Sequence, residues 1–158
     1  MTQHRGEPSG SGPAGLEASS PAAAPAAAGA HPSFHEMWRD LLPIGRHPES
    51  RGYRRFAWTG ADLDCRAWFK DQAEARGLTY EVDRNGNQWA WLGDPAAGDA
   101  VVTGSHLDSV PDGGAFDGPL GVVSSFAALD ELRGRGAELG KPLAIVNFGD
   151  EEGARFGL

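Results

Sequence analysis

The 158-residue sequence contains a single cysteine, Cys65, which excludes an internal disulfide bond. Proteins stabilised by disulfides in oxidising compartments use several cysteines, so cysteine content gives no indication of such a compartment. Cys65 lies at an apolar position of an expected helix, where a lone cysteine usually acts as a small core residue. We therefore expect no catalytic role for it.

The sequence also lacks long apolar stretches. No run approaches the roughly 18 apolar residues that a membrane-spanning helix needs. The N-terminus does not show the charged-then-apolar layout of a secretory signal, because Pro25 interrupts its alanine runs and polar residues precede them. These absences predict a cytoplasmic protein that does not bind membranes.

Clusters of positive charge are scarce as well. The chain has 14 Lys and Arg against 22 Asp and Glu, which gives a net charge of −8. Binding to nucleic-acid phosphates requires grouped basic side chains, so we expect no nucleic-acid partner. The four arginines that do gather between residues 46 and 55 are flanked by Gly and Pro and are typical of a solvated loop.

Glycine, proline and alanine are concentrated at the start of the chain. Residues 1–32 have too few large apolar side chains to offset the entropy of ordering and are expected to form a disordered tail. Residues 33–158 are expected to fold. Ser33 and Glu36 predict a capping box ahead of a helix that Pro43 ends, and Thr59 is the expected N-cap of a second helix.

The pattern after the second helix predicts strands connected by a hairpin and then by a helix. Asn85-Gly86 separates two strand-like runs, which is typical of a hairpin. A strand at 100–103, a helix at about 119–133 and an apolar strand at 143–148 follow, and this order predicts a parallel crossover. The fold class is therefore α/β, with part of a mostly parallel sheet flanked by helices. The helix at 119–133 is expected to bury Leu120, Val123, Ala127 and Leu132.

Polar side chains follow the expected strands at 100–103 and 143–148. His106 and Asp108 come after the first, Glu151 and Glu152 come after the second, and Asp117 precedes the intervening helix. Sites in open α/β sheets form beyond the carboxyl ends of the strands, so we expect these residues to converge.

These residue types suit metal-dependent hydrolysis. Asp108 can hydrogen-bond one imidazole nitrogen of His106 and leave the other for a metal, and Asp117 can bridge two metals. Of the adjacent Glu151 and Glu152, one can bind metal while the other acts as a base. Taken singly, each has an ordinary explanation: a structural histidine, a turn aspartate, a solvated glutamate pair. Their joint position after a buried strand favours a metal site.

Two long motifs carry a resemblance to a known family. Residues 104–121 (Gly-Ser-His-Leu-Asp-Ser-Val-Pro-Asp-Gly-Gly-Ala-Phe-Asp-Gly-Pro-Leu-Gly) and 148–157 (Phe-Gly-Asp-Glu-Glu-Gly-Ala-Arg-Phe-Gly) closely resemble the amidase branch of the M20 metallopeptidase family. The likeness extends back through residues 54–59 and 85–91. It implies a zinc-peptidase-like catalytic domain, of which residues 33–158 would be the N-terminal portion.

The resemblance also implies roles for individual residues. His106 and Glu152 would each bind one of two divalent metals, Asp117 would bridge them, Glu151 would be the general base, and Asp108 would orient His106. The metals would be Zn²⁺ or Mn²⁺, with Co²⁺ or Ni²⁺ also compatible with this ligand set.

The activity implied is hydrolysis of a linear C–N amide bond in a small ureido compound. Allantoate, an intermediate of purine catabolism, is the favoured substrate, and the alternatives are an N-carbamoyl-L-amino acid hydrolase or a β-ureidopropionase. The family site also uses two further histidines and a second, dimerising domain, which would make the full-length protein a homodimer. The sequence up to Leu158 contains neither the two further histidines nor the second domain. We therefore expect this chain alone to bind metal weakly and to show little or no hydrolysis of a ureido substrate. A non-catalytic remnant, or a module that binds a metal or a partner, is the alternative of another class.

Overall fold

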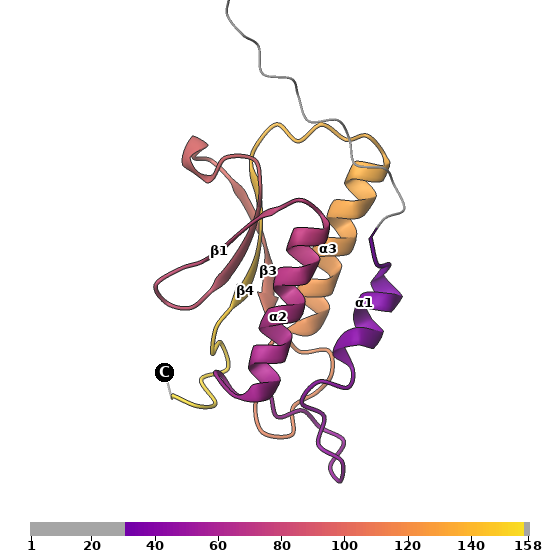
Figure 1. Cartoon of the computed structure of the whole chain (residues 1–158), viewed down its shortest axis with the longest axis vertical. Helices are drawn as coiled ribbons and strands as arrows, with labels where there is room; N and C mark the ends of the chain where they lie inside the picture. Colours follow the sequence, from indigo (N-terminus) through magenta and orange to yellow (C-terminus); the bar gives the residue numbers. More distant parts are fainter. Residues whose placement is uncertain (1–30, 157–158) are drawn as a thin grey trace, which may run out of the picture.

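The computed structural model describes residues 31–156 of the chain. The tail predicted for residues 1–32 lies outside the described residues except for His31 and Pro32. Three α-helices, one short 3-10 helix and four strands follow one another along the chain (Figure 1). In order they are α1 (Phe34–Leu41), α2 (Gly60–Ala75), β1 (Thr79–Val82), β2 (Gln88–Leu92), η1 (Pro95–Ala97), β3 (Val101–His106), α3 (Pro119–Gly134) and β4 (Leu143–Phe148). Within this described part, no helix is long and apolar enough to cross a membrane.

The four strands form one sheet in the order β1-β2-β4-β3. β3 and β4 pair in parallel through the α3 crossover, with His106 opposite Phe148. β2 pairs antiparallel with both β1 and β4. The α/β class is confirmed, but the sheet is mixed over the described residues, not mostly parallel. The reason is the predicted hairpin at Asn85-Gly86, whose short connection can join only antiparallel strands.

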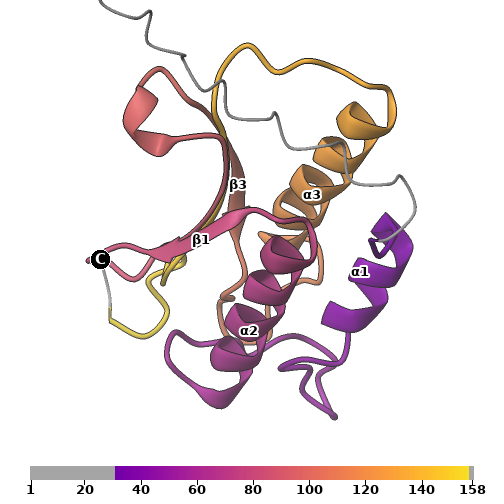
Figure 2. The same ribbon diagram turned by 45° about the horizontal axis from the view of Figure 1, so that its top comes forward.

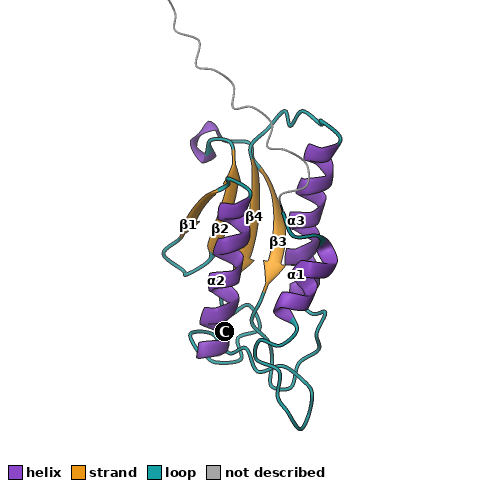
Figure 3. Ribbon diagram, turned by 45° about the vertical axis from the view of Figure 1, so that its right-hand side comes forward, coloured by secondary structure: helices purple, strands orange, loops and turns teal. Residues whose placement is uncertain are grey.

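All three helices lie on one side of the sheet (Figure 2). Trp89 and Trp91 alternate in β2 with the buried Gln88 and Ala90, so their stacked rings lie on the other face of the sheet. In Figure 3 the arrowheads of β3 and β4 point towards the same end of the molecule. The segments that follow these two strands therefore lie side by side, as the sequence predicted.

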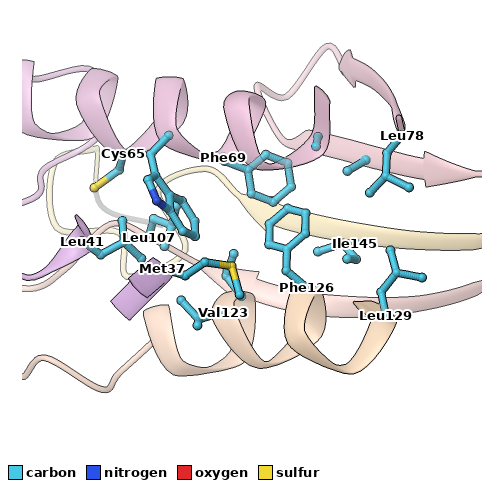
Figure 4. Packing of buried hydrophobic residues seen from close by; sticks show 14 residues of the cluster. Met37, Leu41, Cys65, Phe69, Leu78, Leu107, Val123, Phe126, Leu129 and Ile145 are labelled. Carbon is cyan, nitrogen blue, oxygen red and sulfur yellow. The ribbon is translucent and has the colours of Figure 1, made fainter. Parts of the chain in front are cut away.

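The core lies between the helices and the sheet. Phe69 of α2 and Phe126 of α3 meet at its centre, with ring centroids 5.3 Å apart (Figure 4). The predicted buried stripe of α2 is confirmed, because Cys65, Trp68, Phe69 and Ala73 are all buried.

The predicted stripe of α3 is wrong at two of its four positions. Leu120 and Leu132 are 41% and 38% exposed, and the buried face comprises Val122, Val123, Phe126 and Leu129. Val122 and Val123 lie four and three residues before Phe126, and Leu129 lies three residues after it, so the four form one stripe that places the large Phe126 ring against α2. α3 is apolar on several sides, and periodicity alone does not identify the side that packs.

The two predicted helix starts differ in how they are capped. Ser33 and Glu36 form the expected capping box, in which the Ser33 hydroxyl accepts the backbone N–H of Glu36. Thr59 is the N-cap residue of α2, but its hydroxyl donates to the carbonyl of Phe56 and caps nothing. Asp62 instead accepts the N–H of Trp58 at 2.8 Å and so joins the first turn of α2 to the preceding loop.

Cys65 should be unreactive in the folded protein. Its side chain is fully buried, and burial raises the pKa of the thiol to about 12. Because the thiolate is the reactive form, we expect a disulfide reagent at pH 8 to modify Cys65 only after the protein is unfolded in urea. Equal rates of modification with and without urea would contradict this packing.

Candidate metal centre

His106 is the last residue of β3, which runs three residues beyond its predicted end at Thr103. Its imidazole is nearly buried and lies against Gly118, where a Cβ atom would approach Cε1 to 2.6 Å. Nδ1 lies 3.2 Å from the carbonyl oxygen of Asp108 and 3.3 Å from Oδ1 of its carboxylate. Both atoms are hydrogen-bond acceptors, so Nδ1 carries the proton and neutral His106 presents the Nε2 lone pair outward.

Nε2 of His106 faces carboxylates from two other segments. Oδ1 of Asp117 lies 3.8 Å away, and Oε2 of Glu151 lies 3.4 Å away. One ligand atom each from His106, Asp117 and Glu152 falls within 4.8 Å of the others. The structure thus brings together the five residues that the sequence singled out (His106, Asp108, Asp117, Glu151 and Glu152), from segments up to 46 positions apart.

Asp108 connects the two halves of this cluster. Its carboxylate is buried, and its two oxygens accept the backbone N–H groups of Glu151 (3.3 Å) and Glu152 (3.1 Å). The same carboxylate contacts Nδ1 of His106. One side chain therefore fixes both the imidazole and the turn that carries the glutamates, whereas the sequence predicted only the contact with His106.

The charges around the cluster favour a cation. Burial by itself lowers the pKa of His106, but the hydrogen bond with Asp108 and the charges of Asp108 and Glu151 outweigh it, so the pKa is raised. Burial also raises the pKa of the neighbouring Asp62, and the charges of Asp108 and Asp150 add to this rise. The hydrogen bond from the Trp58 N–H and the charge of Arg66 oppose it. Several carboxylates thus repel one another here, and a bound cation would relieve that repulsion.

The donor set fits a divalent metal ion. Imidazole nitrogen and carboxylate oxygen bind Zn²⁺ at about 2.1 Å, which places two ligands of one tetrahedral ion about 3.4 Å apart. The 3.8 Å between Nε2 of His106 and Oδ1 of Asp117 is close to this spacing. Among the described residues, this is the one group of three His, Cys, Asp or Glu side chains whose possible ligand atoms all lie within 4.8 Å of one another.

Two residues near the cluster were missed by sequence reasoning. Asn87, at the end of the β1–β2 hairpin loop, accepts the N–H of Gly149. Gly149 is the first residue of the turn at residues 149–152 that carries Glu151 and Glu152, which we call the glutamate turn. Asp150 is buried in a left-handed conformation (φ +55°), and its Oδ1 has no hydrogen-bond partner among residues 31–156. The spacing Asp83-x-x-x-Asn87 is typical of a side-chain-stabilised turn and could have drawn attention to Asn87.

Comparisons with known proteins agree on one family, although no protein-family model matches the chain. The chain is 40% identical over 132 residues to allantoate deiminase 2 of Glycine max, covering 78% of this chain and 27% of the relative. It is 38% identical over 124 residues to an N-carbamoyl-L-amino-acid amidohydrolase of Rhizobium meliloti, covering 76% and 30%. A crystal structure of a hydantoinase/carbamoylase family amidase from Burkholderia ambifaria matches with a TM-score of 0.70 at 38% identity, covering 80% and 32%.

The chain spans less than a third of the length of these relatives. Within that span, sequence identity and fold agree, and the matches extend over more than three quarters of the chain. The chain therefore belongs to the family of allantoate deiminases, N-carbamoyl-L-amino acid amidohydrolases and hydantoinase/carbamoylase amidases, and it corresponds to part of the length of these relatives.

Proposed function

We propose that this chain contributes the first half of the catalytic site of a metal-dependent amidohydrolase. The convergence of His106, Asp117 and Glu152 within 4.8 Å, with the carboxylate of Glu151 beside them, is the observation that supports this most strongly. The names of the relatives support hydrolysis of a C–N bond that is not a peptide bond.

The proposed roles follow from the positions of the side chains. His106 and Glu152 would each hold one of two divalent metals, and Asp117 would be available to both; further ligands would come from outside the described residues. When bound, the metal would supply Lewis-acid polarisation of the substrate carbonyl and lower the pKa of water. Zn²⁺ and Mn²⁺ both suit such a donor set.

Glu151 is placed to move a proton. Its carboxylate is half exposed and lies 3.4 Å from Nε2 of His106, so it can reach both the metal position and an incoming substrate. We assign it to accept a proton from the attacking water and to deliver it to the departing nitrogen. Asp108 keeps His106 oriented, since it contacts Nδ1 and leaves Nε2 free.

The proposed substrate is a small ureido compound, R–NH–CO–NH₂, and allantoate is the favoured one. Water would add to the carbonyl and the bond to the terminal nitrogen would break, releasing ammonia and a carbamic acid, R–NH–COOH, which would then lose carbon dioxide to leave the amine R–NH₂. The similarity to allantoate deiminase 2 of Glycine max supports allantoate. An N-carbamoyl-L-amino acid is the second candidate, supported by the similarity to the Rhizobium meliloti amidohydrolase.

The proposal can be tested on the protein as its own cell produces it. The protein would be purified, loaded with Zn²⁺ or Mn²⁺, and assayed for ammonia release from allantoate, N-carbamoyl-L-amino acids and 3-ureidopropionate. We expect release from at least one of these ureido compounds, which a chelator abolishes. No release from any of them with either metal would contradict the proposed activity.

Substitution Glu151→Gln separates proton transfer from metal binding. Glutamine keeps the size of the side chain but cannot accept a proton, so turnover should fall by at least about 100-fold, as expected for loss of a general base. Metal affinity should remain nearly unchanged, as measured by calorimetric titration with Zn²⁺. If turnover persisted, the assignment of Glu151 as the base would be wrong.

A further inference from the structure

The glutamate turn is held in place from a distant part of the chain. The glutamate turn comprises residues 149–152, which follow β4 and include Glu151 and Glu152. Asp150 in this turn has a left-handed conformation, which costs a non-glycine residue free energy. Such a conformation persists only where surrounding contacts enforce it. Asp108 supplies two of these contacts, to the N–H groups of Glu151 and Glu152.

The third contact comes from Asn87. Its side-chain Oδ1 accepts the backbone N–H of Gly149 at 2.9 Å, across 62 positions in the sequence. Gly149 also lies close to the hairpin backbone, since a Cβ atom there would be 3.3 Å from the carbonyl oxygen of Gly86. The β1–β2 hairpin loop thus packs directly against the start of the glutamate turn.

The orientation of the Asn87 amide is fixed by its partners. Its Nδ2 donates to Oδ2 of Asp83 at 2.9 Å, and a carboxylate can only accept. The N–H of Gly149 can only donate, so Oδ1 must point towards Gly149.

The hairpin loop is itself rigidly hydrogen-bonded. Oδ1 of Asp83 accepts the N–H groups of Asn85 and Asn87, each at 2.9 Å, and Oδ2 accepts the indole N–H of Trp89 at 3.0 Å. Arg66 of α2 donates to the carbonyl of Gly86 at 2.8 Å and ties the loop to the helical layer. Asn87 therefore presents Oδ1 from a fixed support.

We propose that Asn87 is a positioning residue of the metal centre, which acts by fixing Gly149 and with it the direction from which Glu151 and Glu152 approach His106. This inference rests on the proposed function, because it assumes that Glu152 binds metal. Loss of the Asn87 contact would let the turn relax and move both carboxylates away from Nε2 of His106. Partners of this kind, one step removed from the ligands, typically change metal affinity by 10- to 100-fold.

The test compares Asn87→Ala with Asn85→Ala in the full chain. Both substitutions remove an asparagine side chain from the same loop, but Asn85 contributes only its backbone N–H to the hydrogen bonds of the loop. Zn²⁺ affinity would be measured by calorimetry, and exchange of the Gly149 amide proton would be measured by NMR. Both measurements would be made without denaturant, at a pH where circular dichroism shows both variants folded. Should Asn87→Ala fail to fold, Asn87→Ser would replace it, because its hydroxyl is one bond too short to reach Gly149.

We expect Asn87→Ala to weaken Zn²⁺ binding by about tenfold or more and to accelerate exchange at Gly149, while Asn85→Ala changes neither. Because Asn87→Ala removes the acceptor of the Gly149 N–H, faster exchange at Gly149 tests the contact itself, and the loss of Zn²⁺ affinity tests its effect on the metal centre. Unchanged Zn²⁺ affinity in Asn87→Ala, or an equal loss in both variants, would overturn the inference and leave the metal site standing. Absence of Zn²⁺ binding by the unaltered chain would overturn the proposed metal site and the inference together.

Discussion

Replacing His106 by Asn should reduce Zn²⁺ affinity by more than about 100-fold, because it would remove a proposed ligand, and residues that only support the ligands already change affinity by 10- to 100-fold. Glu152→Gln should have a comparable effect, since a neutral amide oxygen is a weaker donor than a carboxylate. Calorimetric titration of each variant with Zn²⁺ measures the change. The structure predicts this result because His106, Asp117 and Glu152 provide the three mutually close donor atoms.

His35→Asn is the matched control for His106→Asn. His35 is an exposed residue of α1, on a different element from the metal group, so its loss should leave affinity unchanged. A similar fall in affinity for both histidine variants would mean that Zn²⁺ binds nonspecifically to surface imidazoles.

The second large effect is expected from Gly118→Ala. Gly118 has φ +83°, and an added Cβ atom would lie 2.5 Å from the carbonyl oxygen of His106 and 2.7 Å from its Nδ1. Left-handed strain costs about 1–3 kcal/mol and overpacking about 1–3 kcal/mol more, so unfolding in urea should show a loss of roughly 2–6 kcal/mol. Zn²⁺ affinity should fall as well, because the added Cβ atom would displace the His106 imidazole from its position in the candidate metal centre.

Gly114→Ala provides the comparison within the same loop. No heavy atom lies within 4 Å of a Cβ atom at Gly114, and its φ is not positive. We expect its stability to change by no more than about 0.5 kcal/mol. If Gly118→Ala were equally mild, the close packing of Gly118 on His106 would be incorrect.

Much of the fold could be predicted because its local patterns are strong. The capping box of Ser33 and Glu36 and the α2 stripe through Cys65 and Phe69 are confirmed. The predictions that failed concerned features that depend on tertiary contacts. α3 is apolar on several sides, so the buried side was decided by Phe126 meeting Phe69. The strand order was similarly undetermined, because the sequence indicated a hairpin but not that β2 would lie between β1 and β4.

The convergence of the candidate site residues was more predictable than the strand order, and for a physical reason. Parallel pairing of β3 with β4 places their carboxyl ends together, so residues after the two strands meet wherever the crossover forms. Asn87 escaped prediction because it belongs to an antiparallel hairpin, and nothing local indicates that its side chain reaches Gly149. The second contact of Asp108, to the N–H groups of Glu151 and Glu152, likewise depends on a turn whose path the sequence does not reveal.

We propose that His106, Asp117 and Glu152 form a centre for divalent metal ions. The most direct test is an anomalous-diffraction map from crystals of the Zn²⁺-loaded protein, collected at the zinc absorption edge. The proposal predicts a peak about 2.0–2.2 Å from Nε2 of His106 and from a carboxylate oxygen of Asp117, and, where a second ion is bound, a peak at the same distance from carboxylate oxygens of Asp117 and Glu152. A peak at other side chains only, or none at His106 in Zn²⁺-saturated crystals, would contradict the claim.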